Sequence, residues 1–385
     1  MRAAALTLLV LLSLALAAAS APAQEGGKRK RGGPVPPPPD APATPPGKRA
    51  PATPPPAPKP TSPKTQPPPL AEPVEPPREP GKPPRPPQTL VHYMTGEPAD
   101  AERAPSGPGL VLMGGGPDVS EAFQWMKGVI DGGDVVVLRT SGSDGYNLYL
   151  FEEIGGCDSV ETLMVTTRQL ANSEYVAWRV ATAEAVFIAG GDQATYVAAW
   201  KGTRLSDALS VAWRRGAVLG GTSAGAAVLG RFVFGAKEGG VRSPAVLVDP
   251  FAPAVALERD LFRVSFLDEC LVDSHVGQRQ RRGRLVTFLA RLIQDGWSEH
   301  PLGIGLDEST ALVIARGGKG TVHGRGKVTL FRPTRAPKVC APGLPLELDG
   351  ISAWTLSAGD TVLLPAGVAS VASRAVHASG GVLHE

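Results

Sequence analysis

The side chain best placed for chemistry is Ser223, within the segment Gly-Thr-Ser-Ala-Gly at residues 221–225. This G-x-S-x-G spacing is typical of a nucleophile elbow, in which a serine stands exposed at a tight turn between a strand and a helix. Glycine is needed at such a turn because only a residue without a Cβ lets the neighbouring chain come close. The helix beyond the turn directs its free N–H groups at the serine, so the N–H of Ala224 would stabilise an oxyanion. The alternative is a glycine-rich turn that only packs well.

A serine nucleophile needs a base that takes its proton and a third group that orients the base. Of the six histidines, His275 is the one at the end of a central predicted strand, residues 266–272. Asp307 and Glu308 follow another predicted strand, residues 302–306. We expect the serine, the histidine and one of these acids to meet at one edge of the sheet. The order serine, histidine, acid differs from that of α/β-hydrolases and disfavours that fold. A purely structural role of the histidine in a turn is the alternative.

Strands alternate with helices along the folded part of the chain. The strands are near-continuous apolar runs, and the segments between them carry apolar residues at helical spacing. This pattern predicts an α/β fold with a mainly parallel sheet and helices on both faces. From residue 318 onward, short glycine-rich β segments predict a small C-terminal β region packed on this sheet, whereas 231–248 reads as irregular. The expected strands are 109–113, 134–138, 161–165, 185–189 and 217–219, and the expected helices are 119–130, one containing Trp178 and Ala181, 196–200 and 205–215.

Ligands of parallel sheets bind beyond the carboxyl ends of the strands. Three glycine-rich strand ends converge there: residues 114–116, residues 190–193 and the serine turn. The glycines at 114–116 lack the third glycine and the matched acid of a dinucleotide site, which disfavours nucleotide binding. After the histidine comes a basic cluster that contains Arg279, Arg281 and Arg284. Such clusters are often solvated surface, but guanidinium groups bind carboxylates bidentately, so these arginines are candidates for carboxylate recognition.

The N-terminal segment predicts export. A basic start, an apolar run over residues 3–19 and a small-residue site ending at Ala23 are typical of a secretory signal peptide. A membrane anchor is the weaker alternative, because the run is short and rich in alanine. Export implies a secreted or periplasmic protein with no membrane span after cleavage. The expected organisation is a signal peptide at 1–23, a proline-rich linker at 24–87 in semi-extended, partly polyproline II conformation, a catalytic domain at 88–316 and the small β region at 317–385.

Charge and cysteine content limit the other partners. The formal net charge is +3, and much of the basic excess lies in the proline-rich segment, so nucleic-acid binding is not inferred. The three cysteines, Cys157, Cys270 and Cys340, do not have metal-type spacing, and their odd number leaves at least one outside any intramolecular pair. Their pairing and the oligomeric state stay open, a homodimer included.

Five segments together resemble the cyanophycinase-like serine peptidases, which are relatives of aspartyl dipeptidase. They occur in the order of that family and extend through most of the predicted catalytic domain, from about residue 110 to residue 314. A single match would be weak, whereas five in order are specific. The segments are 190–193, 221–226, 273–275, 278–285 and 303–312.

The resemblance implies a flavodoxin-like fold related to class I glutamine amidotransferases, with serine as the nucleophile and no metal or organic cofactor. It implies the following roles: nucleophile Ser223, base His275, orienting acid Glu308 with Asp307 as the alternative, oxyanion donors Gly191 and Ala224, and substrate-binding positions Asp192, Gln193, Arg279, Arg281 and Arg284.

The substrate that the resemblance implies is an acidic peptide or a cyanophycin-like polymer. In cyanophycinase the substrate is the aspartate–arginine storage polymer, which is cut to β-aspartyl-arginine. The alternatives are an aspartyl dipeptidase, a hydrolase of small esters or amides, and a non-catalytic exported protein that uses the arginine-rich pocket for binding.

Overall fold

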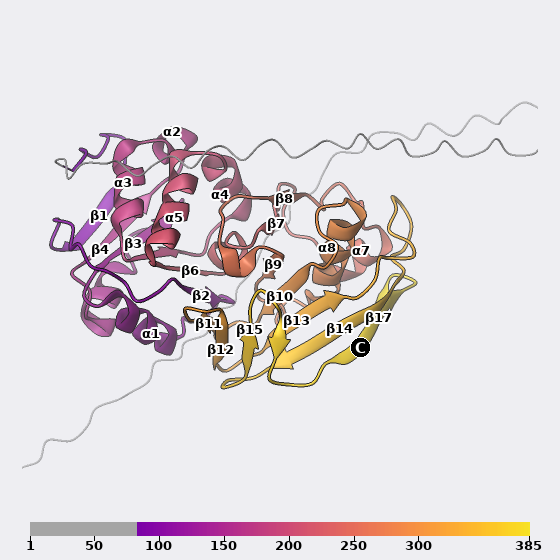
Figure 1. Cartoon of the computed structure of the whole chain (residues 1–385). Helices are drawn as coiled ribbons and strands as arrows, with labels where there is room; N and C mark the ends of the chain where they lie inside the picture. The colour runs from indigo at the N-terminus through magenta and orange to yellow at the C-terminus, as the bar shows by residue number, and fades with distance from the viewer. Residues whose placement is uncertain (1–82) are drawn as a thin grey trace, which may run out of the picture. The chain divides into compact units, whose positions relative to one another are not determined.

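A computed structural model of the chain describes residues 83–385. The predicted signal peptide and most of the predicted linker lie outside the described residues. Within 83–385 the strands form a ten-stranded sheet in the order β1-β4-β3-β5-β6-β2-β11-β12-β15-β16 and an eight-stranded sheet in the order β18-β17-β14-β13-β10-β9-β7-β8. Figure 1 shows both sheets and the helices that cover them.

The first sheet has a parallel core of five strands within the described range. These strands are β4 Ser159–Met164, β3 Asp134–Arg139, β5 Ala185–Ile188, β6 Val218–Thr222 and β2 Gly109–Met113. The order β4-β3-β5-β6 is that of the first four strands of a flavodoxin-like sheet. The fifth place is taken by β2, which precedes the other four in sequence. This places the glycine loop after β2 directly beside the serine turn after β6.

The strands outside this core are antiparallel to their neighbours. The predicted α/β class and parallel core are confirmed, but the sheet is mixed, so the prediction of a mainly parallel sheet is wrong. The core strands read as continuous apolar runs because both faces are covered, and this pattern does not reveal the antiparallel strands added outside them. The added strands are β1 His92–Gly96, β11 Thr310–Ile314, β12 Lys319–Gly324, β15 Thr361–Leu363 and β16 Val368–Ala369.

The second sheet is largely antiparallel, with β7, β9 and β10 parallel to one another. Its strands are β7 Phe232–Phe234, β8 Leu257–Arg259, β9 Cys270–Asp273, β10 Leu302–Leu306, β13 Val328–Pro333, β14 Leu348–Leu356, β17 Arg374–Ser379 and β18 Val382–His384. The two strands expected to bring the histidine and the acid to the main sheet, β9 and β10, both lie here, so that placement is wrong. The strands of 317–385 divide between the two sheets, and the second sheet is larger than the small β region predicted.

The segment predicted to be irregular, 231–248, contains regular structure. It begins with β7 and ends with the short helix α7 Ser243–Val248. Pro244 stands in the first turn of α7, where a proline needs no hydrogen-bond donor. The prediction that 231–248 is irregular is therefore wrong at both of its ends.

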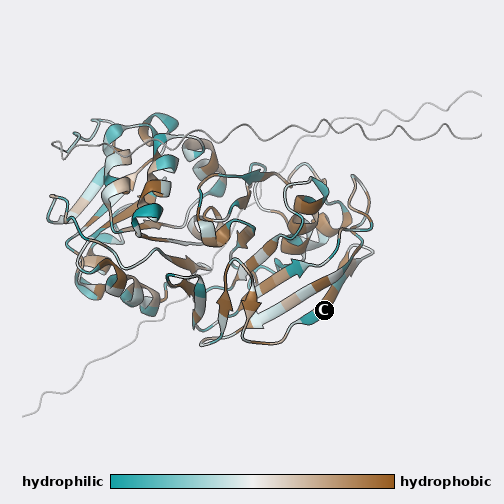
Figure 2. Cartoon of the chain, in the orientation of Figure 1, coloured by the Kyte–Doolittle hydropathy of each residue, from teal (hydrophilic) through white to brown (hydrophobic). Residues whose placement is uncertain are grey.

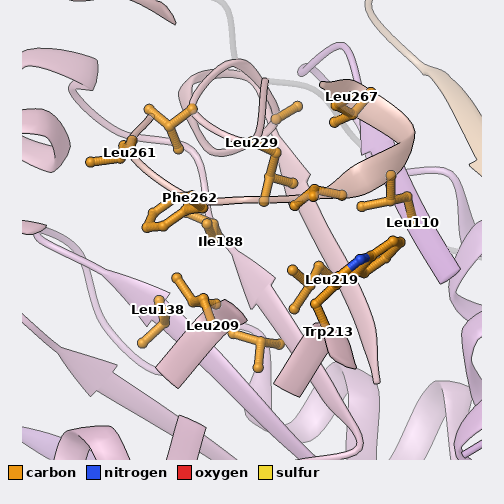
Figure 3. Packing of buried hydrophobic residues seen from close by; sticks show 14 of the residues in the cluster. Leu110, Leu138, Ile188, Leu209, Trp213, Leu219, Leu229, Leu261, Phe262 and Leu267 are labelled. Carbon is orange, nitrogen blue, oxygen red and sulfur yellow. The ribbon is translucent and has the colours of Figure 1, made fainter. Parts of the chain in front are cut away.

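Helices cover both faces of the parallel core, as predicted. On one face α1 and η1 pack on alternate strand residues such as Val111 and Val137, and on the other α3 and α5 pack on Leu110 and Leu138. Figure 3 shows Leu209 and Trp213 of α5 beside Leu219 in this second core. Hydrophilic and hydrophobic stretches alternate along these helices in Figure 2, as expected for helices with one buried side. The helices here are α1 Ser120–Ile130, α2 Arg168–Ala171, α3 Glu174–Thr182, α4 Gln193–Trp200, α5 Arg204–Arg215 and the π-helical turn η1 Tyr149–Ile154.

The remaining helices lie near the second sheet and the serine turn. Leu285, Phe288 and Leu289 of α8 are buried against Phe331 and Leu346 in a separate core. These elements are α6 Ala224–Ala227, α8 Arg282–Gln294 and the 3-10 turn η2 Ser265–Leu267. Between residues 83 and 385 no helix is long and apolar enough to cross a membrane. Cys157, Cys270 and Cys340 are all unpaired in the structure.

Candidate active site

Ser223 stands between β6 and the single turn of α6 in a strained backbone conformation. Its φ is 54° and its ψ is −120°, a region that residues other than glycine rarely occupy. The Ser223 N–H donates to the carbonyl of Met113 at the end of β2, at 3.0 Å. Gly225 closes the turn, because a Cβ at that position would collide with the carbonyl of Ile188. The turn that carries Ser223 therefore has the strand-to-helix geometry of the nucleophile elbow that the sequence predicts.

His275 connects the serine to a carboxylate. It follows β9 in the segment Asp273-Ser274-His275, and its Nε2 lies 2.7 Å from the Oγ of Ser223. Its Nδ1 lies 2.6 Å from Oε1 of Glu308. Because a carboxylate only accepts hydrogen bonds, Nδ1 carries the proton in neutral His275 and Nε2 is left as the acceptor for the serine hydroxyl. These three side chains have the arrangement of a nucleophile, a base and an orienting acid.

The two acids that the sequence offered have different partners. Oδ1 of Asp307 accepts from the N–H of Gly277 at 2.8 Å, and Oδ2 accepts from the N–H of Lys327 at 3.1 Å. Asp307 therefore joins two backbone segments beside the site, and Glu308 is the acid that faces His275. The Glu308 N–H donates to Oε1 of Gln278 at 2.9 Å, which fixes the loop that carries this carboxylate.

The glycine loop after β2 covers the histidine and the acid. A Cβ on Gly115 would come within 2.6 Å of Nε2 of His275, and φ at this residue is +94°. The Gly114 carbonyl accepts from the N–H of His275 at 3.0 Å, and the Gly115 carbonyl accepts from the N–H of Ser309 at 2.9 Å. The sequence places this loop at the ligand-binding edge of the sheet and disfavours a nucleotide site there, but it does not indicate the contact of the loop with His275. The feature of the sequence that could have indicated this contact is the run of glycines directly after a predicted strand.

The electrostatic surroundings favour a neutral histidine. Burial lowers the pKa of His275 below its ordinary value of 6.5, the hydrogen bond with Glu308 opposes this, and the cations of Arg279 and Arg281 lower the pKa further. The side chain of His275 is only 8% exposed. A base that is neutral at pH 7 is ready to accept the proton of a serine hydroxyl.

Of the two predicted oxyanion donors, Ala224 directly follows Ser223, and Gly191 follows a glycine that lies close to Ser223. Ala224 is the first residue of α6, and the first amides of a helix have no acceptor within the helix. Gly191 lies in the loop after β5, and its neighbour Gly190 is positioned so that a Cβ there would lie 3.6 Å from the Cβ of Ser223. Both backbone segments therefore border the nucleophile.

Asp192 and Gln193 have structural partners. The Asp192 carboxylate accepts from the N–H groups of Ala194 and Thr195, at 3.2 and 3.3 Å, and so caps α4. The side-chain amide of Gln193 donates to the carbonyl of Phe234 at 2.9 Å, which ties this loop to β7. In this conformation the two side chains hold the loop that carries Gly191 in place through their hydrogen bonds.

The three predicted substrate-binding arginines have different environments. Arg284 is buried and makes two hydrogen bonds to Asp273, at 2.8 and 2.6 Å, so the structure corrects its predicted role: its guanidinium has no face open to a substrate. Arg281 donates to the carbonyl of Ser274 at 2.9 Å, and burial lowers its pKa to about 10. Arg279 is exposed, close enough to influence His275, and has no ion-pair partner among the described residues. It is the arginine best placed to meet a carboxylate.

No group of three or more histidine, cysteine, aspartate or glutamate side chains in the described part of the chain has a geometry suited to a metal ion. The site is made of a serine, a histidine, a glutamate and backbone amides. This arrangement supports attack of a serine oxygen on a carbonyl carbon, with stabilisation of the oxyanion by N–H groups.

Comparison with known proteins gives a family match that includes this site, together with similar relatives. Residues 147–321 match the family model described as Peptidase family S51. The cyanophycinase of Trichormus variabilis (strain ATCC 29413 / PCC 7937) is 32% identical over 223 residues, which cover 56% of this chain and 68% of that protein. The cyanophycinase of Synechococcus elongatus is 34% identical over 187 residues, covering 48% of this chain and 52% of that protein. A solved structure of a peptidase from an acI-B1 Actinobacterium aligns over 68% of this chain and 99% of its own with 19% identity and a TM-score of 0.46.

Substitution of Gly115 tests whether the glycine loop holds the histidine in place. We expect Gly115→Ala to slow labelling of Ser223 by a fluorophosphonate about a hundredfold, because the new methyl displaces the ring of His275. The matched control is Gly132→Ala, at a φ of +76° with nothing within 4 Å of the added Cβ. Labelling rates are compared by mass spectrometry of the intact protein. Equal rates in the two variants would mean that the loop does not position the base.

The pH dependence of the same reaction reports on His275. Labelling requires the neutral imidazole, so the rate falls as the pH drops through the pKa of His275, with a midpoint below 6.5. We expect Arg279→Gln to move this midpoint to higher pH, since it removes a cation that disfavours the imidazolium. Arg214→Gln, at an exposed position of α5, is the control for loss of one positive charge. A midpoint above 6.5 in the unmodified protein would contradict the expectation that the labelling rate follows a His275 with a lowered pKa.

Proposed function

The chain belongs to peptidase family S51 and is a cyanophycinase-like serine peptidase, and from this premise we propose that it hydrolyses aspartyl-containing peptide or isopeptide bonds after export from the cytoplasm. The observation that carries the proposal is the hydrogen-bonded series from Ser223 through His275 to Glu308 beside the exposed Arg279. The substrate class we propose is the one that the resemblance implies, an aspartate–arginine polymer cut to β-aspartyl-arginine.

The proposed reaction begins with acylation. The Ser223 oxygen attacks the carbonyl carbon while Nε2 of His275 takes its proton, and Glu308 stabilises the imidazolium that forms. The N–H groups of Ala224 and Gly191 would stabilise the negative charge on the carbonyl oxygen. His275 then protonates the leaving amine, the carbon–nitrogen bond breaks, and an acyl-serine ester remains.

Deacylation repeats these steps with water. His275 takes a proton from the water, the hydroxide attacks the ester carbonyl, and the serine oxygen leaves with the proton that His275 returns. The product is a carboxylic acid, and the enzyme recovers its starting state. Arg279 would bind an aspartyl carboxylate of the substrate, because a guanidinium can form bidentate hydrogen bonds with a carboxylate.

The first test compares the full chain with its Ser223→Ala variant on cyanophycin and on β-aspartyl dipeptides, with products identified by mass spectrometry. We expect release of β-aspartyl-arginine to fall by about 10⁴-fold or more in the variant, because the nucleophile is lost. Ser210→Ala on α5 is the control, since its hydroxyl only contacts a helix carbonyl. Undiminished release by the Ser223 variant would rule out the proposed nucleophile. Hydrolysis of dipeptides alone would assign the chain to the aspartyl dipeptidases.

Export is tested separately, by the N-terminus of the mature protein. The proposal rests on the basic, apolar and small-residue regions of 1–23. Expressed in a Gram-negative host, the full chain should appear in the periplasm or medium beginning at Gln24. Leu9→Arg combined with Leu11→Arg should retain it in the cytoplasm, whereas Arg2→Lys should not, because that change keeps the positive charge. Cytoplasmic retention of the unmodified chain would contradict export.

A further inference from the structure

A pocket that the mechanism does not use lies at the same edge of the first sheet as Ser223. Its volume is about 490 Å³, and it is lined by Asp118, Arg139, Gly145, Tyr146 and Tyr149. Asp118 follows the glycine loop that covers His275, and Arg139 is the last residue of β3. None of these residues was among the site positions expected from the sequence.

The strand register relates this pocket to the nucleophile. Leu138 of β3 pairs with Ile188 of β5, which pairs with Gly221 of β6. Arg139 and Thr222 are each one residue further along, so they lie at the same level two strands apart. With neighbouring strands about 4.8 Å apart, the separation is roughly 10 Å. A side chain of a residue bound next to the scissile bond can span that distance.

The pocket is lined by one carboxylate, that of Asp118, and one guanidinium, that of Arg139, which do not form an ion pair with each other. Oδ2 of Asp118 accepts from the hydroxyl of Tyr146 at 2.9 Å, while Oδ1 is shielded from solvent and has no hydrogen-bond partner among residues 83–385. Asp118 forms no ion pair within that range. Burial raises its pKa, as expected for a carboxylate withdrawn from water. An unpaired charge of this kind is unfavourable until a cation compensates it.

The other walls suit a planar cation. The rings of Tyr146 and Tyr149 are held by edge-to-face contacts with Phe123, with ring centroids 6.2 and 5.7 Å from its own. Tyrosine rings attract cations, and a guanidinium stacks on them more readily than an ammonium does. Arg139 donates to the carbonyls of Ser141 and Ser143, at 2.7 and 2.5 Å, so these N–H groups are directed at its own loop, while its positive charge remains in the pocket wall.

We propose that this pocket binds a guanidinium-bearing side chain of the substrate, with Asp118 as its carboxylate partner. The inference rests on the proposed function, in which the substrate carries arginine linked to aspartate. It assigns the two ends of the substrate to different residues: aspartyl carboxylates to the side of Arg279, and the arginine side chain to the pocket of Asp118.

The test uses two aspartyl peptides that differ only in carrying arginine or citrulline on the β-carboxyl, since citrulline has nearly the shape of arginine without its charge. In the full-length enzyme we expect kcat/KM to favour the arginine peptide, and Asp118→Asn to reduce that preference about tenfold or more. The introduced amide would keep an oxygen for the Tyr146 hydroxyl, so folding should be preserved, and thermal melting checks this. Glu121→Gln, at an exposed position of α1, is the control for loss of one negative charge.

A binding measurement separates this proposal from the proposed function. N-acetyl-argininamide and N-acetyl-citrullinamide are titrated into the Ser223→Ala protein, with and without Asp118→Asn, by isothermal calorimetry. Selective binding of the arginine compound that Asp118→Asn abolishes supports the pocket even if neither peptide is hydrolysed. Equal binding of both compounds, or an unchanged arginine preference in Asp118→Asn, overturns it. A loss caused by Arg139→Gln instead would identify the pocket as a carboxylate site and overturns it as well.

Discussion

The hydrogen bond between Ser223 and His275 joins the two sheets, and the surrounding structure is arranged to keep it. The serine follows β6 of the first sheet, and the histidine follows β9 of the second. One of the passages of the chain between the two sheets runs through Asp307, Glu308 and Ser309, between β10 and β11. The acid thus lies at one of the places where the chain passes between the sheets, and there the carbonyls of the glycine loop after β2 accept hydrogen bonds from the N–H groups of His275 and Ser309. The site depends on the contact between the sheets more than on either sheet alone.

A buried ion pair supports the second half of this contact. Asp273 ends β9, two residues before His275, and both its oxygens accept from Arg284 of α8. Because His275 has a φ of 53°, the turn that carries it is strained and needs fixed ends. Breaking a buried pair by removing one partner usually costs about 3–5 kcal/mol, since the other charge is left unpaired. This makes Arg284 a positioning residue, which acts on the histidine through Asp273 and the backbone.

The sequence predicts local elements better than their assignment to sheets. Strands 109–113 and 185–189 and the elbow at 221–225 were predictable because periodicity and glycine spacing are local signals. The partner sheet of β9 and β10 was not, since an apolar run looks the same in either sheet. Arg284 was misjudged for a related reason: its partner Asp273 lies on a different element, and a basic cluster does not reveal which of its members is buried. Glu308 and Asp307 are neighbouring acids in the sequence, and only the folded structure shows that the side chain of Glu308, not that of Asp307, is directed at His275.

The arginines near His275 have two effects that support each other. Burial is the main cause of the lowered pKa of His275, and the two cations add to it by disfavouring the imidazolium, while the side chain of Arg279 stays exposed to solvent. A carboxylate bound at Arg279 would offset that positive charge and raise the pKa of His275. The base would then become a stronger proton acceptor when an acidic substrate is in place and the serine proton must move. Recognition of the acid and activation of the nucleophile would therefore be coupled through one guanidinium, without any change in the backbone.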